Sequence, residues 1–210
     1  MTRRLVQLQG LDVFYPIVPS AEWLARLLPL GVKTVQLRVK DAAADIVASE
    51  IAVALEMCRR AGCQLIVNDY WREALAAGAD FVHLGQEDLA EADVAALKAR
   101  GVRLGISTHS HEELATALAA QPDYVALGPV YETRLKVMKW APQGLDRIAD
   151  WRRRIGELPL VAIGGLTPER ADAVLDAGAD SLAVVTDFMT HAEPDARVSA
   201  WLALAARHRA

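Results

Sequence analysis

The segment Thr34–Lys40 carries cationic and amide side chains in a pattern that could bind an anion. Its sequence, TVQLRVK, alternates apolar and polar residues. Successive side chains of a strand point to opposite faces, so Gln36, Arg38 and Lys40 should share one face of a strand. A buried cation without a partner is costly, and these residues therefore need either a protein carboxylate or the phosphate of a ligand.

Two aspartates follow the next two apolar runs of the chain. Asp69 comes directly after Asn68, and Asp88 ends the sequence HLGQED. The two carboxylates could be counter-ions of the cations, or they could hold Mg²⁺, which typically takes one or two carboxylates together with water and substrate phosphates. Cations and carboxylates at one rim suit a magnesium diphosphate better than either group would alone.

A pair of glycines indicates a second anion site. Gly164 and Gly165 follow an apolar run and would allow a ligand to approach the backbone closely. Thr167 and Pro168 are typical of the N-cap and the first residue of a helix, and helix N-termini bind phosphate through backbone N–H groups. We therefore predict two separate anionic groups among the ligands.

The longest predicted connection, Pro129–Gln143, is rich in cations. It contains Thr133, Arg134, Lys136 and Lys139. Long loops within a small domain are often active-site lids, and a cationic lid would close over phosphate and exclude water. The simpler alternative is a basic loop that is exposed to solvent.

The segments that would position these residues alternate between strand-like and helix-like patterns along the whole chain. The predicted strands are Val13–Val18, Thr34–Val39, Gln64–Val67, Phe81–Leu84, Arg103–Ile106, Tyr124–Leu127, Leu160–Ile163 and Ser181–Val185. The predicted helices are Ala21–Leu30, Ala43–Ala61, Arg72–Ala77, Glu91–Arg100, His111–Ala120, Gly144–Ile155, Pro168–Ala177 and Ala196–Arg207.

Strict alternation predicts a parallel sheet, and eight units favour closure into a (β/α)8 TIM barrel of the α/β class. An open doubly wound sheet is the alternative, but Val18-Pro19-Ser20 is not the Gly-rich turn typical of that fold. The similar hexapeptides LAAGAD, from Leu75, and LDAGAD, from Leu175, would suit two half-barrels of four units. Since no linker interrupts residues 1–210, we predict a single domain with its site at the carboxyl ends of the strands.

The composition limits the classes of function. The chain has 210 residues, of which 53% are hydrophobic, and a formal net charge of −4. An acidic balance argues against a dominant nucleic-acid surface, and the apolar runs are shorter than the roughly 20 residues of a membrane span. Cys58 and Cys63 are predicted to be free, buried thiols of a reducing compartment, which indicates a cytoplasmic protein.

Several other residues carry weaker signals. His83 lies inside a predicted strand and is predicted to be a hydrogen-bonded core residue. His109 and His111 could bind a metal, but a third nitrogen or thiolate ligand is not evident in the sequence. The run Trp151–Arg154 is predicted to be a solvated helix face.

Taken together, these segments resemble the thiamine phosphate synthase family, also called thiamine-phosphate pyrophosphorylase, over nearly the whole chain. That family is a small (β/α)8 barrel of transferases. The resemblance implies that a hydroxymethylpyrimidine diphosphate loses pyrophosphate and that the nitrogen of a thiazole phosphate captures the pyrimidine methylene, giving thiamine phosphate. The matching segments are QLRVK (36–40), NDYW (68–71), GADFVHLGQED (78–88), GISTH (105–109), YVALGP (124–129), APQG (141–144), VAIGG (161–165) and AVV (183–185).

The resemblance also implies a role for each site residue. Mg²⁺ would be held by Asp69 and Asp88. Ser107 would contact the pyrimidine or the departing pyrophosphate, and we expect it to be catalytic together with Lys40 and Lys136. The diphosphate would lie near Gln36, Arg38, Lys40, Asn68 and Lys136. The thiazole phosphate would lie on Thr133, Gly165, Val185 and Thr186.

The chain departs from the family pattern in two places. Glu132-Thr-Arg-Leu-Lys136 replaces the usual Pro-Thr-x-Thr-Lys of the lid, so that Leu135 removes a phosphate donor. Asp187 and Phe188 follow Thr186, where small or aliphatic residues are common. Both departures concern the affinity for the thiazole phosphate rather than the fold.

Three alternative functions remain on the same barrel. A thiazole tautomerase-like isomerase, or a non-catalytic regulator, would bind only the thiazole phosphate, and an aldolase would form a Schiff base on Lys40. The joint presence of Lys40, Asn68, Asp69, Asp88 and Lys136 favours the synthase. The expected partners are the two small-molecule substrates, without nucleic acid or membrane, and a homo-oligomer is left open.

Overall fold

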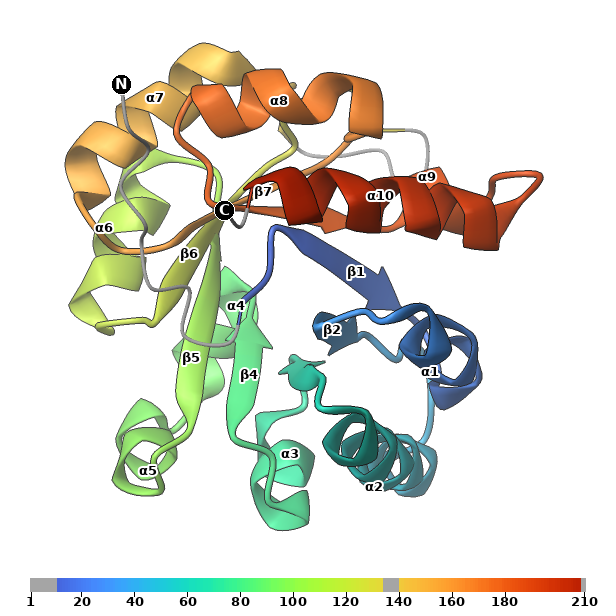
Figure 1. Ribbon diagram of the computed structural model, residues 1–210. Coiled ribbons are helices and arrows are strands. Elements are labelled where there is room, and N and C mark those ends of the chain that lie inside the picture. Colours follow the sequence, from blue (N-terminus) through green and yellow to red (C-terminus); the bar gives the residue numbers. More distant parts are fainter. Residues whose placement is uncertain (1–10, 134–139, 209–210) are drawn as a thin grey trace.

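In the computed structural model, which describes residues 11–133 and 140–208, eight parallel strands close into one barrel. Each strand pairs with its neighbours in chain order, and β1 pairs with β8 to complete the ring (Figure 1). The predicted (β/α)8 fold is therefore confirmed. The strands are β1 Phe14–Val18, β2 Thr34–Leu37, β3 Gln64–Asn68, β4 Phe81–Leu84, β5 Arg103–Thr108, β6 Tyr124–Leu127, β7 Leu160–Ile163 and β8 Ser181–Val184.

Helices surround the barrel in Figure 1. They are α1 Ala21–Leu27, the 3-10 helix η1 Leu28–Leu30, α2 Ala44–Ala61, α3 Trp71–Ala77, α4 Gln86–Glu91, α5 Val94–Ala99, α6 His111–Ala119, α7 Gly144–Ile155, α8 Pro168–Asp176, α9 Thr186–Met189 and α10 Pro194–His208. The helix predicted over Glu91–Arg100 is shorter in the structure, where α5 begins at Val94 and Glu91 is instead the last residue of α4. Asp93 begins α5 by accepting a hydrogen bond from Ala96 N at 2.8 Å. Within the described ranges, the helices lack the combination of length and apolar composition that crossing a membrane requires.

Apolar side chains pack in two layers, one inside the barrel and one between the barrel and the helices. Tyr15, Phe81 and Tyr124 are the largest residues of the inner layer. Alternate positions on the strands, such as Val35 and Leu37, face outwards and pack beneath the helices. Because both faces of each strand are covered, the strands have the continuous apolar character that predicts a parallel sheet.

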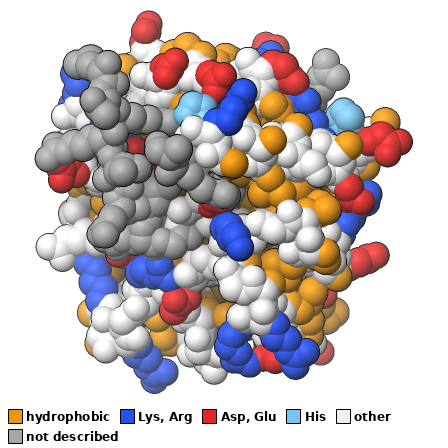
Figure 2. All heavy atoms as spheres, viewed as in Figure 1, with side chains coloured by type: hydrophobic (Ala, Val, Ile, Leu, Met, Phe, Trp, Pro, Cys, Tyr) orange, Lys and Arg blue, Asp and Glu red, His pale blue; other side chains and the backbone are white. Residues whose placement is uncertain are grey.

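The surface carries charges of both signs close together. On the face seen in Figure 2, the described acidic and basic side chains are interspersed around the edge. This distribution agrees with a chain that has 23 Lys and Arg residues against 27 Asp and Glu residues. An anionic ligand must therefore be held by a local cluster of groups and not by the field of the whole molecule.

Helix α7 packs more closely against the barrel than its sequence suggests. The prediction of a solvated face at Trp151–Arg154 is wrong for the first two residues of the run. Trp151 is buried and donates from Nε1 to Thr108 Oγ1 at 2.8 Å. Arg152 forms an ion pair with Asp180, which fastens α7 to the start of β8. The last two arginines of the run are exposed, as predicted.

Strand β2 ends earlier than predicted, and this changes where its polar residues lie. Gln36 points into the barrel, where its Nε2 donates to Tyr15 Oη at 2.7 Å. The alternating pattern predicts Arg38 inside the strand, but the strand ends at Leu37. Arg38 therefore lies in the loop that follows β2 at the C-terminal mouth. Lys40 follows in the same loop and is exposed.

Candidate functional site

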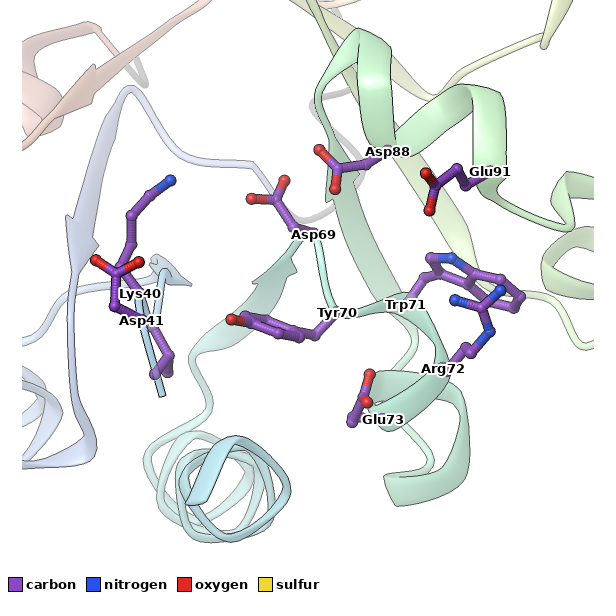
Figure 3. Close-up of a pocket in the computed structure, with 10 residues that line it drawn as sticks. Lys40, Asp41, Asp69, Tyr70, Trp71, Arg72, Glu73, Asp88 and Glu91 are labelled. Carbon is purple, nitrogen blue, oxygen red and sulfur yellow. The ribbon is translucent and has the colours of Figure 1, made fainter. Parts of the chain in front are cut away.

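A pocket of about 330 Å³ opens at the C-terminal mouth of the barrel, beside the ends of β2, β3 and β4. In the view of Figure 3, the Asp69 carboxylate lies between the Lys40 side chain and the Asp88 carboxylate. Asp69 follows β3, Asp88 is in the first turn of α4, and Lys40 follows β2. Both predicted metal ligands and one predicted cation therefore line one pocket. The other lining residues are Val39, Asp41, Tyr70, Trp71, Arg72, Glu73 and Glu91.

The backbone turns sharply at Asp69. Its φ of +66° lies in the left-handed region, which aspartate tolerates better than most residues do. Asp69 N donates to His83 O at 2.8 Å, and Trp71 N donates to Asp69 O at 2.6 Å, so the turn is held against β4. A conformation of this kind costs about 1–3 kcal/mol and persists where its surroundings enforce it. Here it coincides with the position of a predicted metal ligand.

Burial and charge together disfavour the ionised form of Asp69. Loss of solvation raises the pKa of Asp69 above its ordinary value, and the Asp88 carboxylate raises it further, whereas Lys40, Arg38 and the Asn68 side chain oppose this effect. Among the carboxylates that line the pocket, those of Asp69 and Asp88 therefore repel one another, and the cations Lys40 and Arg38 act on Asp69 from nearby. A divalent cation bound between the carboxylates would remove their repulsion.

Asp69→Asn should raise the melting temperature of the metal-free protein near neutral pH while it lowers activity. Because the pKa of Asp69 is raised in the folded state, folding favours the protonated form of this side chain. The contribution of this protonated form to the stability of the protein is complete below the ordinary carboxyl pKa of about 4 and is lost as the pH rises through the raised pKa. Asparagine avoids this loss and also tolerates a positive φ. The gain in melting temperature should therefore shrink as the pH falls towards about 4. Thermal unfolding in EDTA measures it, and a variant that is less stable at every pH would contradict this account.

Asn68 has an unpaired side-chain nitrogen beside the pocket. Its Nδ2 is buried and has no hydrogen-bond partner of good geometry among the described residues, although the side chain lies close enough to Asp69 to lower the pKa of that carboxyl. The residue is the last of β3 and is 5% exposed. A buried donor without a partner costs about 1–3 kcal/mol, so a group of this kind points to an acceptor supplied by a ligand. This position suits the predicted contact between Asn68 and a diphosphate.

Inside the barrel, a chain of hydrogen bonds links Gln36, Tyr15, Tyr124, His83 and Ser107, which we call the interior relay. Gln36 Nε2 lies 2.7 Å from Tyr15 Oη, and Tyr15 Oη lies 3.0 Å from Tyr124 Oη. Tyr124 Oη lies 2.7 Å from His83 Nδ1, and His83 Nε2 lies 2.8 Å from Ser107 Oγ. Burial lowers the pKa of His83 to about 3, so its ring is neutral. The prediction of a hydrogen-bonded core histidine is confirmed, whereas the sequence patterns do not single out either tyrosine.

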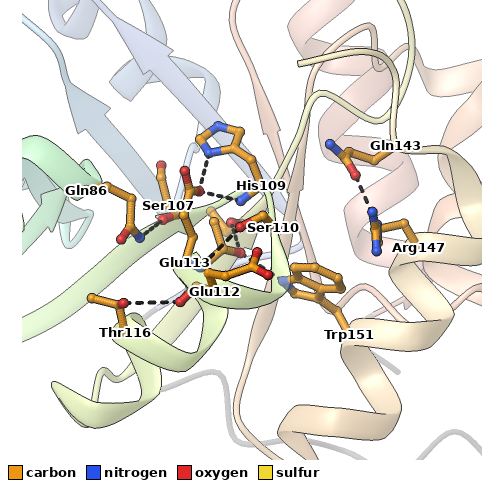
Figure 4. Close-up of polar contacts among 12 residues, drawn as sticks. Gln86, Ser107, His109, Ser110, Glu112, Glu113, Thr116, Gln143, Arg147 and Trp151 are labelled. Carbon is orange, nitrogen blue, oxygen red and sulfur yellow. Dashed lines mark hydrogen bonds and ion pairs between the residues drawn. The ribbon is translucent and has the colours of Figure 1, made fainter. Parts of the chain in front are cut away.

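Ser107 and the residues that follow it are held by side chains of α4 and α6 (Figure 4). Gln86 Nε2 donates to Ser107 O at 2.7 Å. His109 Nδ1 lies 2.7 Å from Glu113 Oε2, and His111 Nε2 lies 2.8 Å from a carboxylate of α7. Each histidine of the candidate His-x-His pair is thus engaged by a different carboxylate. No group of three or more potential His, Cys, Asp or Glu metal ligands occurs within residues 11–133 and 140–208.

The second predicted anion site lies where β7 and β8 end. The two strands are neighbours, Gly165 follows β7, and Val185 and Thr186 follow β8. Gly165 has a φ of +64°, and a Cβ at this position would lie 2.5 Å from the carbonyl oxygen of Glu132. Glycine therefore allows the segment that leads to Thr133 to pack against this turn.

The structure groups the predicted site residues into two sets. The first set, at the ends of β2 to β5, contains Gln36, Arg38, Lys40, Asn68, Asp69, Asp88 and Ser107. The second set, beside the ends of β7 and β8, contains Thr133, Gly165, Val185 and Thr186. Lys136 and the rest of the predicted cationic lid, residues 134–139, lie outside the described residues.

Asp187, the unusual residue after Thr186, joins α9 to α10. Its carboxylate accepts two hydrogen bonds from Arg197 and one from Trp201 Nε1, each at 2.8 Å. The Asp187 side chain is 10% exposed and that of Arg197 is 17% exposed. The negative charge of Asp187 is therefore balanced by an arginine of α10, and Phe188 beside it is buried in the outer core.

Asp187→Ala should lower the free energy of unfolding by about 2 kcal/mol, because it leaves a largely buried guanidinium without its main partner. Glu169→Ala is the matched control. Glu169 also contacts Arg197, at 2.8 Å, but its side chain is 67% exposed. Its removal should cost less than about 1 kcal/mol. Urea unfolding compares the two variants, and equal losses would show that Asp187 has no special structural role.

The closed parallel barrel and the charged groups at its C-terminal mouth place the chain among the (β/α)8-barrel enzymes, whose active sites are built from these loops. Comparison with known proteins narrows this class. The model of the thiamine monophosphate synthase family matches residues 14–188, and the chain belongs to this family.

Individual relatives agree with this assignment. A thiamine-phosphate synthase from Rhizobium etli is 61% identical over 199 residues, which cover 95% of this chain and 98% of the relative. One from Neisseria meningitidis is 47% identical over 191 residues, which cover 91% and 93%. A solved thiamine phosphate pyrophosphorylase from Pyrococcus furiosus has a TM-score of 0.84 at 24% identity, over 97% of this chain and 99% of that one. The last likeness supports the fold alone.

Proposed function

We propose that this chain is a transferase that joins hydroxymethylpyrimidine diphosphate to thiazole phosphate and releases pyrophosphate. The relatives at 61% and 47% identity are named thiamine-phosphate synthase, and thiamine phosphate is the product of this reaction. The observation that carries the proposal is the pocket in which Asp69, Asp88 and Lys40 meet, beside the unpaired amide of Asn68. A tautomerase-like isomerase or a regulator that binds only thiazole phosphate would have no use for this set.

The reaction breaks the C–O bond between the pyrimidine methylene and the diphosphate, and the bonding electrons leave with pyrophosphate. The lone pair of the thiazole nitrogen then forms a C–N bond with the methylene cation. A protein nucleophile is not required. The task of the chain is to stabilise the leaving charge and to hold both substrates in position.

Cations at the rim would neutralise the leaving diphosphate. Arg38 and Lys40 follow β2, and their positive charges already act on Asp69. Asn68 Nδ2 would donate to a phosphate oxygen, which would satisfy the buried donor. Lys40 is exposed, unlike the desolvated lysine that a Schiff-base aldolase needs, so an electrostatic role suits it better.

Asp69 and Asp88 would hold Mg²⁺. Their fit to the ion rests on two hard carboxylate oxygen donors in one pocket, where the charge of Asp88 helps to raise the pKa of Asp69. A site with only two protein carboxylates suits an ion that keeps water and phosphate ligands. When bound, the ion would supply further neutralisation of the diphosphate charge.

The second set of residues would bind the other substrate. Barrels of this class often bind phosphate where β7 and β8 end. The residues of the second set at this place are Thr133, Gly165, Val185 and Thr186. The apolar inner layer beneath the site, which includes Tyr15, would limit the access of water to the pyrimidine cation. Water would otherwise compete with the thiazole nitrogen.

The proposal is tested by incubation of the purified protein with both substrates and Mg²⁺. We expect thiamine phosphate and pyrophosphate in equal amounts, with no product when either substrate is omitted or when EDTA is added. Isomerised thiazole without coupling would replace the proposal with a tautomerase. Binding of thiazole phosphate without any reaction would replace it with a regulator.

The cellular location and the oligomeric state depend on separate measurements. Cys58 and Cys63 are free and buried, which supports a cytoplasmic location. Fractionation of the source cells would test this location. The homo-oligomer stays a prediction, and light scattering on the purified protein would measure its mass.

A further inference from the structure

The interior relay connects five strands through side chains that are almost fully buried. Tyr15, Gln36, His83 and Tyr124 are each 6% exposed or less, whereas Ser107, near the end of β5, is partly exposed. Buried polar groups are costly unless all of them find partners. Each link of the relay has a distance of 3.0 Å or less between its two atoms. The relay is therefore a built feature of the barrel interior.

Packing holds the central rings of the relay in place. The rings of His83 and Tyr124 stack with centroids 5.5 Å apart and planes inclined by 19°. Gly105, on the intervening strand β5, makes room for the phenol: a Cβ at Gly105 would lie 2.5 Å from Tyr124 Oη. Any larger residue at this position would move the hydroxyl away from His83. The backbone and the stacked rings thus restrict the hydrogen bonds to one set of partners.

The chemistry of the donors gives the relay a direction. The amide nitrogen of Gln36 can only donate, so Tyr15 Oη accepts from it. Either tyrosine could donate in the contact between Tyr15 Oη and Tyr124 Oη, and we assign Tyr15 as the donor because Tyr124 Oη is the acceptor that lies within reach of its hydrogen among the described contacts. With Tyr15 as the donor, the hydrogen of Tyr124 Oη is assigned to His83 Nδ1 in the same way. A neutral His83 whose Nδ1 accepts has its hydrogen on Nε2, which donates to Ser107 Oγ.

We propose that the interior relay holds His83 in the Nε2–H tautomer and thereby leaves the hydroxyl hydrogen of Ser107 to an acceptor atom of the pyrimidine diphosphate. Tyr15, Tyr124 and His83 are then positioning residues, and Ser107 is the group that touches the substrate. The identity of the acceptor rests on the proposed function, whereas the tautomer does not. If the amide oxygen and nitrogen of Gln36 exchanged places, the donor and acceptor of each hydrogen bond in the relay would exchange as well, and Ser107 would donate to His83 instead.

The tautomer is measured on the native protein without ligand. Long-range ¹H–¹⁵N correlation spectra of histidine-labelled protein distinguish the two neutral tautomers, and His83→Gln identifies the signals of His83. We expect a single neutral Nε2–H form. An Nδ1–H form, or an equal mixture of the two, would overturn the proposal whether or not the protein has synthase activity.

Kinetics test whether the relay acts through Ser107. Tyr124→Phe should lower kcat about tenfold, the effect of one lost hydrogen bond, with little change in KM. In a Ser107→Ala background the same change should have almost no further effect, because the two residues act as one unit. Tyr15→Phe, the same chemical change one link further away, should have a smaller effect. Losses that multiply in the double variant would show that Tyr124 has only a structural role.

The acceptor atom is identified by binding measurements on Ser107→Ala. Loss of affinity for inorganic pyrophosphate with Mg²⁺ would assign the hydroxyl to the diphosphate. Loss of affinity confined to the hydroxymethylpyrimidine alcohol would assign it to a ring nitrogen. Unchanged affinity for both probes would contradict a donor role for Ser107, even if the tautomer is as expected.

Discussion

Asp88→Asn should lower kcat by about a thousandfold and leave the melting temperature nearly unchanged. The variant keeps the shape of the side chain but removes one of the two carboxylates that are predicted to hold the metal ion in the pocket. Because Asp88 is also in the first turn of α4, its charge stabilises the helix, though by only about 0.3–1 kcal/mol. The loss of activity should therefore greatly exceed the loss of stability. Steady-state kinetics and thermal unfolding of the same preparation measure both.

A carboxylate on the same helix provides the control for Asp88. Glu91 also lines the pocket, but it is at the end of α4 and is exposed. Glu91→Gln removes the same charge at the other end of α4, and it should change kcat less than about threefold. If both variants lose activity equally, the general negative charge of the pocket matters and a specific metal ligand at Asp88 is contradicted. If Asp88→Asn loses stability as much as activity, Asp88 is only a counter-ion.

Gly165→Ala should raise the KM for thiazole phosphate about a hundredfold and leave the affinity for pyrophosphate unchanged. The added Cβ would lie 2.5 Å from the Glu132 carbonyl oxygen, a contact that the backbone must relieve by moving. This movement would displace the segment that leads to Thr133 in the second set of site residues. The first set, at the ends of β2 to β5, should be unaffected because it lies on other strands. Calorimetric titration with each ligand measures the two affinities separately.

Gly62 separates the effect of backbone strain from the effect of the close contact. It ends α2 with a φ of +61°, similar to the +64° of Gly165, but a Cβ there would meet nothing within 4 Å. Gly62→Ala should cost about 1 kcal/mol of stability and leave both affinities unchanged. An equal change in KM for the two variants would mean that general destabilisation, and not the displaced loop, weakens thiazole phosphate binding.

The sequence was sufficient for the closed barrel because that information is local. Apolar runs such as Phe81–Leu84 alternate with amphipathic segments, and each run has the same bounds in the sequence pattern and in the structure, or differs by one or two residues. The charged and amide residues fall at strand ends, where a parallel barrel must gather them at one mouth. The grouping of Asp69 with Asp88 follows from chain order alone, since β3 and β4 are neighbours.

Local patterns were not sufficient where a partner from elsewhere decides the state of a residue. The cationic run at Trp151–Arg154 has the polarity of an exposed face, yet Trp151 is buried against Thr108, which is 43 positions away. Asp187 follows a segment that is predicted to bind phosphate, yet its charge is balanced by Arg197 of α10. The sequence gives the type of each side chain, but it does not show which distant residue will bury an apolar side chain or neutralise a charged one.

What the sequence by itself determined is the order of the elements, the (β/α)8 closure and the set of charged residues at the mouth, because strand periodicity and chain order specify these directly. Only the tertiary structure decided which polar side chains meet inside the barrel. Tyr15 and Tyr124 are 109 positions apart, and their hydroxyls come within 3.0 Å because ring closure turns β1 and β6 towards a common axis. A contact across the barrel depends on the packing of all eight strands, so the pattern of any single strand cannot encode it.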